Sequence, residues 1–273
     1  MRNVFKDLLS PPRQRFQLYL LIIHVINILI INLTGFIVRD FWLTHIKDDE
    51  MDIDYVEESI LTFQMCGSAL EIYSISHRKD ISFNPIIYSA VSFCLSLYWQ
   101  SLNLNAKGTA NYYLERVVIC GDKFSSIFLI ISSQLIAGHF AWLYDCILRS
   151  FEGIKVTNDT CHPDLNFLYS VKTTLMQSSV QFVDSLNIHL AADYFLCRNI
   201  VWKAGLETLL GCINSALTGG FSNPNMATVV HYECFGVNDN GIKHFVTFII
   251  HYWFGSLFGS VMAHHFYHTF IDT

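Results

Sequence analysis

Charge is scarce in this sequence, and its scarcity excludes several classes of protein. Only 15% of the 273 residues are charged, against about 25% in a typical soluble domain, while 52% are hydrophobic. The net charge of −6 lacks the basic excess that nucleic-acid binding requires. No segment alternates apolar and polar residues over about ten positions, as the strands of a membrane barrel do. An ordinary soluble domain, a nucleic-acid-binding protein and a barrel are therefore excluded.

The motifs of common enzymes and metal centres are missing as well. The eight cysteines form no Cys-x-x-Cys pair, and most lie inside apolar segments, where cysteine acts as a small buried hydrophobe. No serine lies in a nucleophile elbow, and there is no phosphate-binding loop. His264, His265 and His268 include an i, i+4 pair, but no third ligand is placed beside it, so we interpret them as interfacial histidines. The sequence predicts no enzyme, no cofactor and no metal site.

Long apolar segments dominate what is present. Seven segments are predicted to be helices: 17–38, 55–75, 81–102, 123–148, 167–190, 200–217 and 244–270. The first is too long for the apolar region of a signal peptide and has no small-residue cleavage site, so we expect a retained membrane helix. We therefore predict an all-α membrane protein that crosses the bilayer several times.

A short helix is predicted after Gly219 and Gly220. Pro224 suits the first turn of a helix, where its missing N–H is not needed, and Asn223 is then the N-cap residue. The apolar run 224–235 is too short to span a bilayer, which takes about 20 residues. We expect a half-helix that enters the membrane with its N-terminus near the midplane.

A second short stretch stands in a matching place. Residues 103–115 follow the third apolar segment, and Asn105 stands where Asn223 stands in the later stretch. Residues 53–149 and 166–270 therefore form two copies of a three-helix unit. Because three is odd, the second copy enters the bilayer from the opposite side, which makes an inverted repeat. The two half-helices would then meet end to end at the midplane.

This arrangement resembles the aquaporin, or major intrinsic protein, family, whose two Asn-Pro-Ala boxes occupy these positions. Asn223-Pro224-Asn225 corresponds to the second box and Asn105-Ala106-Lys107 to a degraded first box. Deviant boxes and an added N-terminal segment are similar to the unorthodox, or superaquaporin, subfamily, as is Cys234, nine residues past the second box. Three further stretches share the likeness: Thr62-Phe63-Gln64-Met65-Cys66, Leu217-Thr218-Gly219 and His231-Tyr232-Glu233-Cys234-Phe235.

The resemblance implies a fold of six transmembrane helices plus two re-entrant half-helices over 53–273, preceded by a segment 1–52 with one extra hydrophobic helix. The box asparagines would donate hydrogen bonds to a passing solute, and two facing helix N-termini would exclude cations and protons. Glu58 matches a family glutamate that accepts hydrogen bonds from the first re-entrant loop, and Gln177 is its equivalent in the second repeat. The alternative for both is a simple polar residue near a helix end.

Three departures from the family bear on selectivity. Met226 stands where the family has an arginine, which removes a fixed charge from the outer constriction. The other constriction positions fall near Pro85, Gly211 and Gly220, all small or apolar, so we predict a wider and less polar filter. Lys107 replaces a small residue of the first box, and two positions stay open: it faces the pore and narrows it, or it bends toward the aqueous vestibule.

We expect a passive channel for water and small neutral solutes such as glycerol or hydrogen peroxide, working without a cofactor. Its partners would be these solutes and membrane lipid, and the family's tetramers imply a homotetramer with one pore per subunit. One alternative is a non-conducting structural or assembly protein on the same fold. Another is a proton-coupled transporter that uses Asp145, Asp184 and Asp193, which we otherwise interpret as solvated residues near segment ends.

Location and orientation are only partly predicted. The subfamily resemblance implies the endoplasmic reticulum or another intracellular membrane, with the plasma membrane as the alternative. Asn158 begins a glycosylation sequon on a loop that is extracytosolic in the family arrangement. If segment 17–38 spans the bilayer fully, the basic residues within 2–15 become extracytosolic, against the positive-inside rule. Either that segment lies partly in the interface, or the rule is overridden.

Overall fold

The computed structural model describes residues 12–46, 55–77, 85–102, 106–151, 167–191, 194, 198–218, 223–232 and 241–271. The helices are α2 (Pro12–His45), α3 (Tyr55–His77), α4 (Pro85–Ser101), α5 (Ala110–Cys120), α6 (Phe124–Phe151), α7 (Phe167–Leu190), α9 (Ile200–Thr218), α10 (Pro224–Val230), α11 (Gly241–Phe248), the π-helix η3 (Ile249–Phe254) and α12 (Gly255–Phe270). Every regular element within these ranges is helical, which confirms the all-α prediction.

Each of the seven apolar segments forms a helix close to its predicted limits. The largest difference is at α2, which has 34 residues and begins at Pro12, a residue that the first turn of a helix tolerates. The last apolar segment is one continuous run of α11, η3 and α12, in which a π-helical stretch interrupts the α-helix. Hydrophobic run length thus predicts where these helices lie, because each run had to be removed from water.

Three helices within the described ranges are long and apolar enough to cross a bilayer: Leu21–His45, Phe124–Ser150 and Phe245–Phe270. Large apolar side chains are also exposed on the surface, among them Leu29, Phe124 and Phe258, each more than 60% exposed. Such a surface is poorly matched to water and well matched to hydrocarbon. These are the features of a membrane protein. The other four apolar helices are shorter or carry charged residues, so seven spans stay a prediction.

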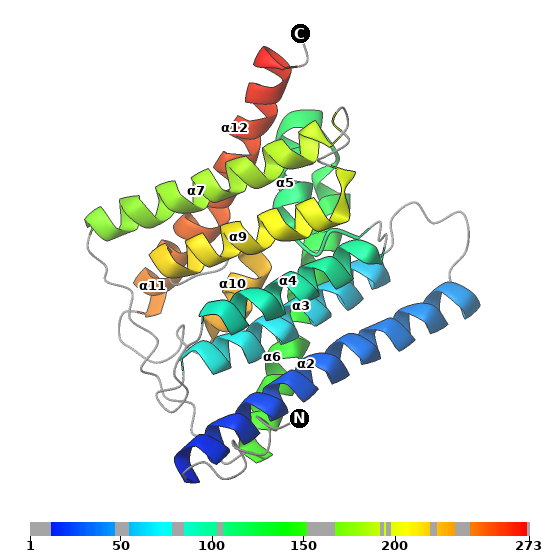
Figure 1. Ribbon diagram of the computed structural model, residues 1–273. Helices are drawn as coiled ribbons and strands as arrows, with labels where there is room; N and C mark the ends of the chain where they lie inside the picture. Colours follow the sequence, from blue (N-terminus) through cyan, green and yellow to red (C-terminus); the bar gives the residue numbers. More distant parts are fainter. Residues whose placement is uncertain are drawn as a thin grey trace.

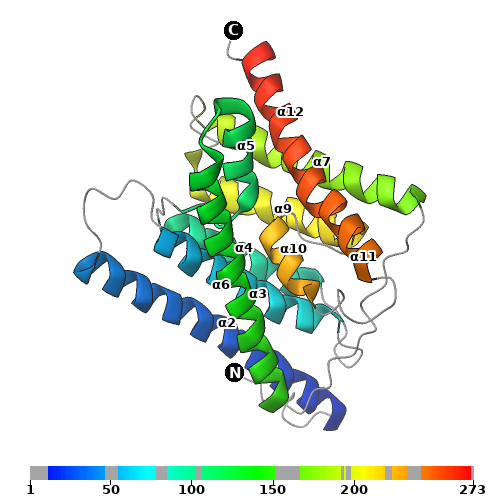
Figure 2. The same cartoon turned by 180° about the vertical axis from the view of Figure 1, so that it is seen from behind.

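The helices pair in a reciprocal way between the two halves of the chain. In the first half α3 packs against α6, and in the second half α7 packs against α12, while α4 and α9 lie side by side (Figures 1 and 2). The short helix α10 of the second half packs against α3 and α6 of the first. The short helix α5 of the first half packs against α12 of the second. Each half therefore holds the short helix of the other.

Small residues allow α12 to approach α7 closely. Gly255 and Gly259 are four residues apart on α12 and are both buried. A Cβ atom added at Gly259 would overlap the carbonyl oxygen of Ser178 on α7, and one at Gly255 would lie 3.2 Å from the Thr174 carbonyl oxygen. This is the small-residue spacing that brings helix backbones together in membranes.

The N-terminal helix α2 lies along one edge of the molecule and packs on α3 through polar contacts (Figure 1). His24 Nδ1 lies 2.5 Å from Glu71 Oε2, and both side chains are about 95% buried. Asn32 donates to the Ser68 hydroxyl at 2.9 Å and accepts from Trp99 Nε1 of α4 at 3.0 Å. Buried polar groups need partners, so these pairs fix the position of α2 along α3.

Candidate functional site

The short helix α10 begins as its sequence predicts. Asn223 is the N-cap residue, and its side-chain oxygen accepts a hydrogen bond from the Asn225 backbone N–H at 2.9 Å. Pro224 occupies the first turn, where no N–H is needed. The helix ends at Val230, earlier than the expected limit near 235, and His231 is its C-cap residue, with the ring Nδ1 2.8 Å from the Ala227 carbonyl oxygen. The helix has only seven residues and is too short to span a bilayer.

The first box differs from the expectation. We placed the start of its helix directly after Asn105, but residues 106–109 are not helical and α5 begins at Ala110. The reason is at Gly108, whose φ of +63° lies in the left-handed region and interrupts helix formation. Without a proline to set the first turn, helical geometry begins only after Thr109, whose backbone is extended. Asn105 itself lies outside the described residues.

The two boxes meet at the Gly108 carbonyl oxygen. The side-chain amide of Asn223 donates to this oxygen at 2.9 Å, and that of Asn225 approaches it at 3.4 Å. Asn223 is half-buried, whereas Asn225 is only 1% exposed. A side-chain amide has two hydrogens, so the bond to Gly108 occupies one of the two that Asn223 can donate. These hydrogen bonds hold the start of α10 against the loop before α5.

A buried carboxylate holds the same loop from the other side. Glu58 on α3 is 2% exposed and accepts hydrogen bonds from the backbone N–H groups of Lys107 at 2.6 Å and Gly108 at 3.0 Å. It also accepts from the Tyr113 hydroxyl and, at 2.7 Å, from the Gln134 side chain. These are the loop contacts that the family resemblance implies for a glutamate at this position. Both carboxylate oxygens are fully used, so the loop has one defined conformation.

Gln134 connects the two boxes, and sequence analysis did not identify it. Its amide nitrogen donates to Glu58 and its oxygen accepts from Asn225 Nδ2 at 3.0 Å. The side chain is fully buried in the middle of α6. The signal was a single amide in the stretch Ile130–Ala137, whose other polar residues are Ser132 and Ser133, since a polar group buried in a membrane helix needs a partner on another helix.

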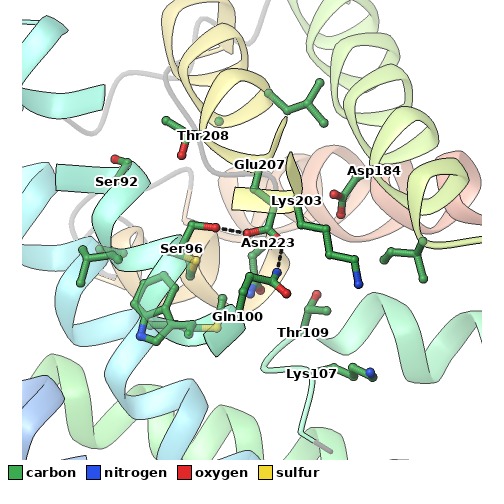
Figure 3. Close-up of a pocket in the computed structure, with 18 of the residues that line it drawn as sticks. Ser92, Ser96, Gln100, Lys107, Thr109, Asp184, Lys203, Glu207, Thr208 and Asn223 are labelled. Carbon is green, nitrogen blue, oxygen red and sulfur yellow. Dashed lines mark hydrogen bonds between the residues drawn. The ribbon is translucent and has the colours of Figure 1, made fainter. Parts of the chain in front are cut away.

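A cavity of about 520 Å³ adjoins this junction (Figure 3). It lies between α3 and α4 on one side and α7 and α9 on the other, with the start of α5 and of α10 at its wall. Five of the predicted box and filter residues line it: Ala106, Lys107, Gly211, Asn223 and Met226. Around Gly211 a Cβ atom would meet nothing within 4 Å, so the wall is open there.

The cavity also carries charged groups that sequence analysis did not assign to it. Glu207 of α9 accepts hydrogen bonds from the Ser96 hydroxyl and, at 2.5 Å, from the Gln100 amide of α4. Asp184 and Lys203 line the same space (Figure 3). The signal was the pair of charges at Lys203 and Glu207, four residues apart in an apolar segment, which one helix face would present together.

Lys107 lies at the edge of the cavity. Its side chain is exposed, and its ammonium lies 5.2 Å from the centroid of the Tyr112 ring, within reach of a cation–π interaction. In Figure 3 the side chain extends away from Asn223 and Glu207. The Tyr112 ring thus holds the ammonium group at the rim of the cavity. Of the two expected positions, this is closer to a side chain that bends toward the vestibule than to one that narrows the pore at the asparagines.

The remaining predicted residues have varied placements. Gln177 is fully buried on α7, but residues 219–222, which include Gly220 and the loop it would hold, lie outside the described residues. Pro224 is buried behind the cavity wall, and Pro85 begins α4 without lining the cavity. Asn158, Asp193 and Cys234 also lie outside the described residues.

The interpretation of Asp145 as a solvated residue is wrong. Its side chain is 3% exposed in α6 and pairs with Arg149, one turn further on, at 2.7 Å. The helix continues to Phe151, so Asp145 is not at its end. A buried carboxylate needs a charged or hydrogen-bonding partner, and Arg149 supplies both.

Comparison of the chain with protein-family models, with curated proteins and with solved structures finds no match. The family and the function therefore have to be inferred from the residues and their geometry.

Proposed function

We propose that this protein is a passive membrane channel for water and small neutral solutes, with an aquaporin-like inverted repeat. The observation that carries the proposal is the junction of two chain segments at Gly108 and Asn223 beside a cavity of about 520 Å³. The reciprocal packing of α5 and α10 supports the repeat. Short helices inside a bundle of apolar helices are typical of membrane proteins that line a solute path with them. Packing of the long helices alone would not require them.

The mechanism we propose is an exchange of hydrogen bonds at the junction. A solute oxygen would accept the second amide hydrogen of Asn223, the one that the Gly108 carbonyl does not use. In this mechanism the N-terminal ends of α5 and α10 face the same point, where their partial positive charges would disfavour cations. A neutral solute keeps its hydrogen bonds on passing this point, whereas an ion loses hydration without compensation.

The lining of the cavity favours a solute with both carbon and hydroxyl groups. One part is apolar, with Leu61, Met65, Leu95, Leu210 and Met226. Another part is polar, with Ser92, Ser96, Thr109, Thr208 and Asn223. Met226 presents a thioether where the family that the sequence resembles has an arginine, so this position adds no fixed charge to the passage. We infer that glycerol and hydrogen peroxide pass as well as water.

Flux into proteoliposomes tests the proposal. Osmotic shrinkage is followed by light scattering, first against an impermeant osmolyte and then against glycerol. We expect water and glycerol permeability well above that of empty liposomes. Gly211→Trp should remove most of both, because its ring would fill the cavity from a position with open space around it. Gly211→Ala is the matched control and should conduct like the wild type.

If the folded wild-type protein raises neither water nor glycerol permeability above that of empty liposomes, the channel proposal is refuted. That result would favour the non-conducting structural or assembly protein. The hydrogen bonds from the two boxes to Glu58 and Gly108 would then serve only to stabilise the fold. Conduction that Gly211→Trp leaves intact would place the path outside this cavity.

A second candidate is a proton-coupled transporter, and the charges in the cavity favour it. Asp184, Lys203 and Glu207 lie together at one cavity inside the helix bundle (Figure 3). Ionisable groups inside a membrane protein commonly mark a proton or substrate path. This candidate predicts solute accumulation against its gradient when a pH gradient is imposed, and its loss in Glu207→Gln. The exposed Asp40→Asn on α2 is the control. A channel shows only downhill flux.

Assembly and location are proposals that follow from the same resemblance. We infer a homotetramer with one pore per subunit, residing in the endoplasmic reticulum or another intracellular membrane. Chemical cross-linking in native membranes followed by mass determination tests the tetramer, and a single monomeric band would contradict it. Fluorescence microscopy of a tagged chain tests the compartment.

A further inference from the structure

Three helices bring metal-binding side chains together at one end of the molecule, away from the junction described above. Glu115 of α5, His189 of α7 and His264 of α12 lie where these helices meet (Figures 1 and 2). One ligand atom from each lies within 4.8 Å of the other two. Sequence analysis found the histidines of α12 but placed no third ligand beside them, because Glu115 and His189 come from distant parts of the chain.

The closest pair already has the spacing of two ligands on one ion. Glu115 Oε1 and His189 Nε2 are 3.3 Å apart. Around a tetrahedral zinc ion, with bonds of about 2.0–2.1 Å, adjacent ligand atoms are about 3.3 Å apart. The side chains are 14% and 21% exposed, so they are largely removed from water yet reachable by an ion. His264 completes the set by a small side-chain movement.

The candidate for a fourth ligand is also on α12. His268 lies one turn beyond His264, and their ring centroids are 4.3 Å apart. Two histidines at i and i+4 present their rings on one face of a helix. The ring of His189 is also held in place, since it stacks on Tyr267 with centroids 5.5 Å apart and planes 24° from parallel. An oriented ring makes a better ligand than a free one.

The chemistry of the set selects the kind of ion. Imidazole nitrogens suit zinc and neighbouring transition metals, whereas calcium and magnesium prefer oxygen ligands. With neutral imidazoles, the Glu115 carboxylate is the one negative charge among the four ligands, so a divalent cation is partly neutralised. A mere ion pair between Glu115 and His189 would not need His264 and His268 beside it.

We propose that Glu115, His189 and His264, with His268 as the fourth ligand, bind a divalent transition-metal ion of the zinc class. The ion ties α5 to α7 and α12. Because the Ala106–Thr109 loop directly precedes α5, the metal would fix the helix that follows this loop at the cavity. The binding does not depend on the proposed channel function, and each can fail without the other.

Metal binding to the purified full chain tests the proposal. The protein is prepared in detergent without a histidine tag, and Zn²⁺ is titrated by calorimetry, with Co²⁺ as a spectroscopic probe of the ligands. We expect one saturable ion per chain and four-coordinate Co²⁺ with nitrogen and oxygen ligands. Loss of outer-shell partners alone commonly weakens metal sites by about 10- to 100-fold, so Glu115→Gln and His264→Asn should each weaken binding at least about tenfold.

The neighbouring histidine provides the matched control. His265 is exposed on the same helix and is not part of the ligand set, so His265→Asn should bind Zn²⁺ like the wild type. Glu115→Gln keeps the size of the side chain, so it reports on the site even if a histidine variant fails to fold. No saturable binding to the wild type, or equal affinity in Glu115→Gln and His264→Asn, would overturn the proposal. A thiolate absorption band with Co²⁺ would also overturn it, because the ion would then be on a cysteine such as Cys120.

Discussion

At the scale of single residues, one carboxylate decides the conformation of the first box. The two oxygens of Glu58 accept from two backbone N–H groups, a tyrosine hydroxyl and a glutamine amide. Because Glu58 is only 2% exposed, a donor that loses this carboxylate is left facing a site with little room for water. The loop 106–109 therefore depends on a residue that is about fifty positions away in the chain.

Glu58→Gln should destabilise the protein, because the amide has only one oxygen that accepts, and its NH₂ group would face two donors, one backbone N–H and one side chain. A hydrogen bond to a charged group is worth about 1.5–3 kcal/mol, so we expect a loss of that order. Thermal and denaturant unfolding of the variant in detergent measures it. The exposed Asp40→Asn should leave stability unchanged. Equal stability of Glu58→Gln and wild type would mean that the loop is held by other contacts.

Gly108 is the second residue on which the junction depends. With φ at +63°, any other residue is strained by about 1–2 kcal/mol, and a Cβ atom would also lie 2.5 Å from Met65 Sδ. Gly108→Ala should lower the unfolding free energy by about that amount and reduce solute flux, since its carbonyl holds Asn223. Gly211→Ala, with open space around it, is the control. If Gly108→Ala is stable and its solute flux is unchanged, the hydrogen bond from Asn223 to the Gly108 carbonyl is not needed for conduction.

Sequence analysis predicted where the helix of the second box starts, but not where the helix of the first box starts, and the difference has a physical reason. The cap at Asn223 and the proline after it act within two or three residues, so local sequence is enough to place the start of α10. Nothing local marks Thr109 as the residue before α5, because its side chain makes no capping hydrogen bond. That start depends on Glu58 and Gly108, and such a contact has no local signature.

At the scale of helices, close contact between α7 and α12 brings several features together. Gly259 lies against the Ser178 carbonyl, and the polar pair Ser185 and Ser260 joins the same two helices at 2.9 Å. Further along, His189 and His264 face each other with ring centroids 5.1 Å apart. The spacing of the helix axes at Gly259 therefore also sets the distance between the metal ligands.

Gly259→Ala should separate these helices, because the methyl group would overlap a backbone carbonyl that cannot move aside. Overpacking of a close-packed interior typically costs about 1–3 kcal/mol, and we expect a loss in that range. Unfolding in detergent measures the stability, and Zn²⁺ affinity reports on the ligand distances. Gly205→Ala is the control, since its nearest neighbour would be 4.0 Å away. Loss of stability with unchanged zinc affinity would show that the two features are independent.

The helices themselves were largely predictable, whereas their functional faces were not. Runs of apolar residues place α3, α6 and α7 to within three residues, because length and hydrophobicity are properties of each segment alone. Which charges share a cavity depends on how helices far apart in the chain pack. Ser96 and Glu207 are 111 positions apart, and Glu115 and His189 meet only because α5 and α7 both reach α12.

At the scale of the whole molecule, the cavity joins a polar side to an apolar side, and Met226 lies at their boundary. It lines the cavity beside Asn223 and also packs on the buried cluster of Cys66, Leu70, Ala141 and Val229. The side chain is thus both part of the passage and part of the core that supports α10. A substitution at Met226 should change solute selectivity more than it changes the fold if the new side chain extends into the cavity.

Met226→Arg is the substitution that tests selectivity of the entire passage. A guanidinium reaching into the cavity would add a fixed positive charge and five hydrogen-bond donors and would leave less room. We expect glycerol permeability to fall several-fold more than water permeability, so their ratio, measured in the same proteoliposomes, should drop. Met226→Leu keeps the apolar character and should keep the ratio. If Met226→Arg folds and the ratio is unchanged, the solute path does not pass this residue, and the width that we attribute to the missing arginine must come from another part of the cavity.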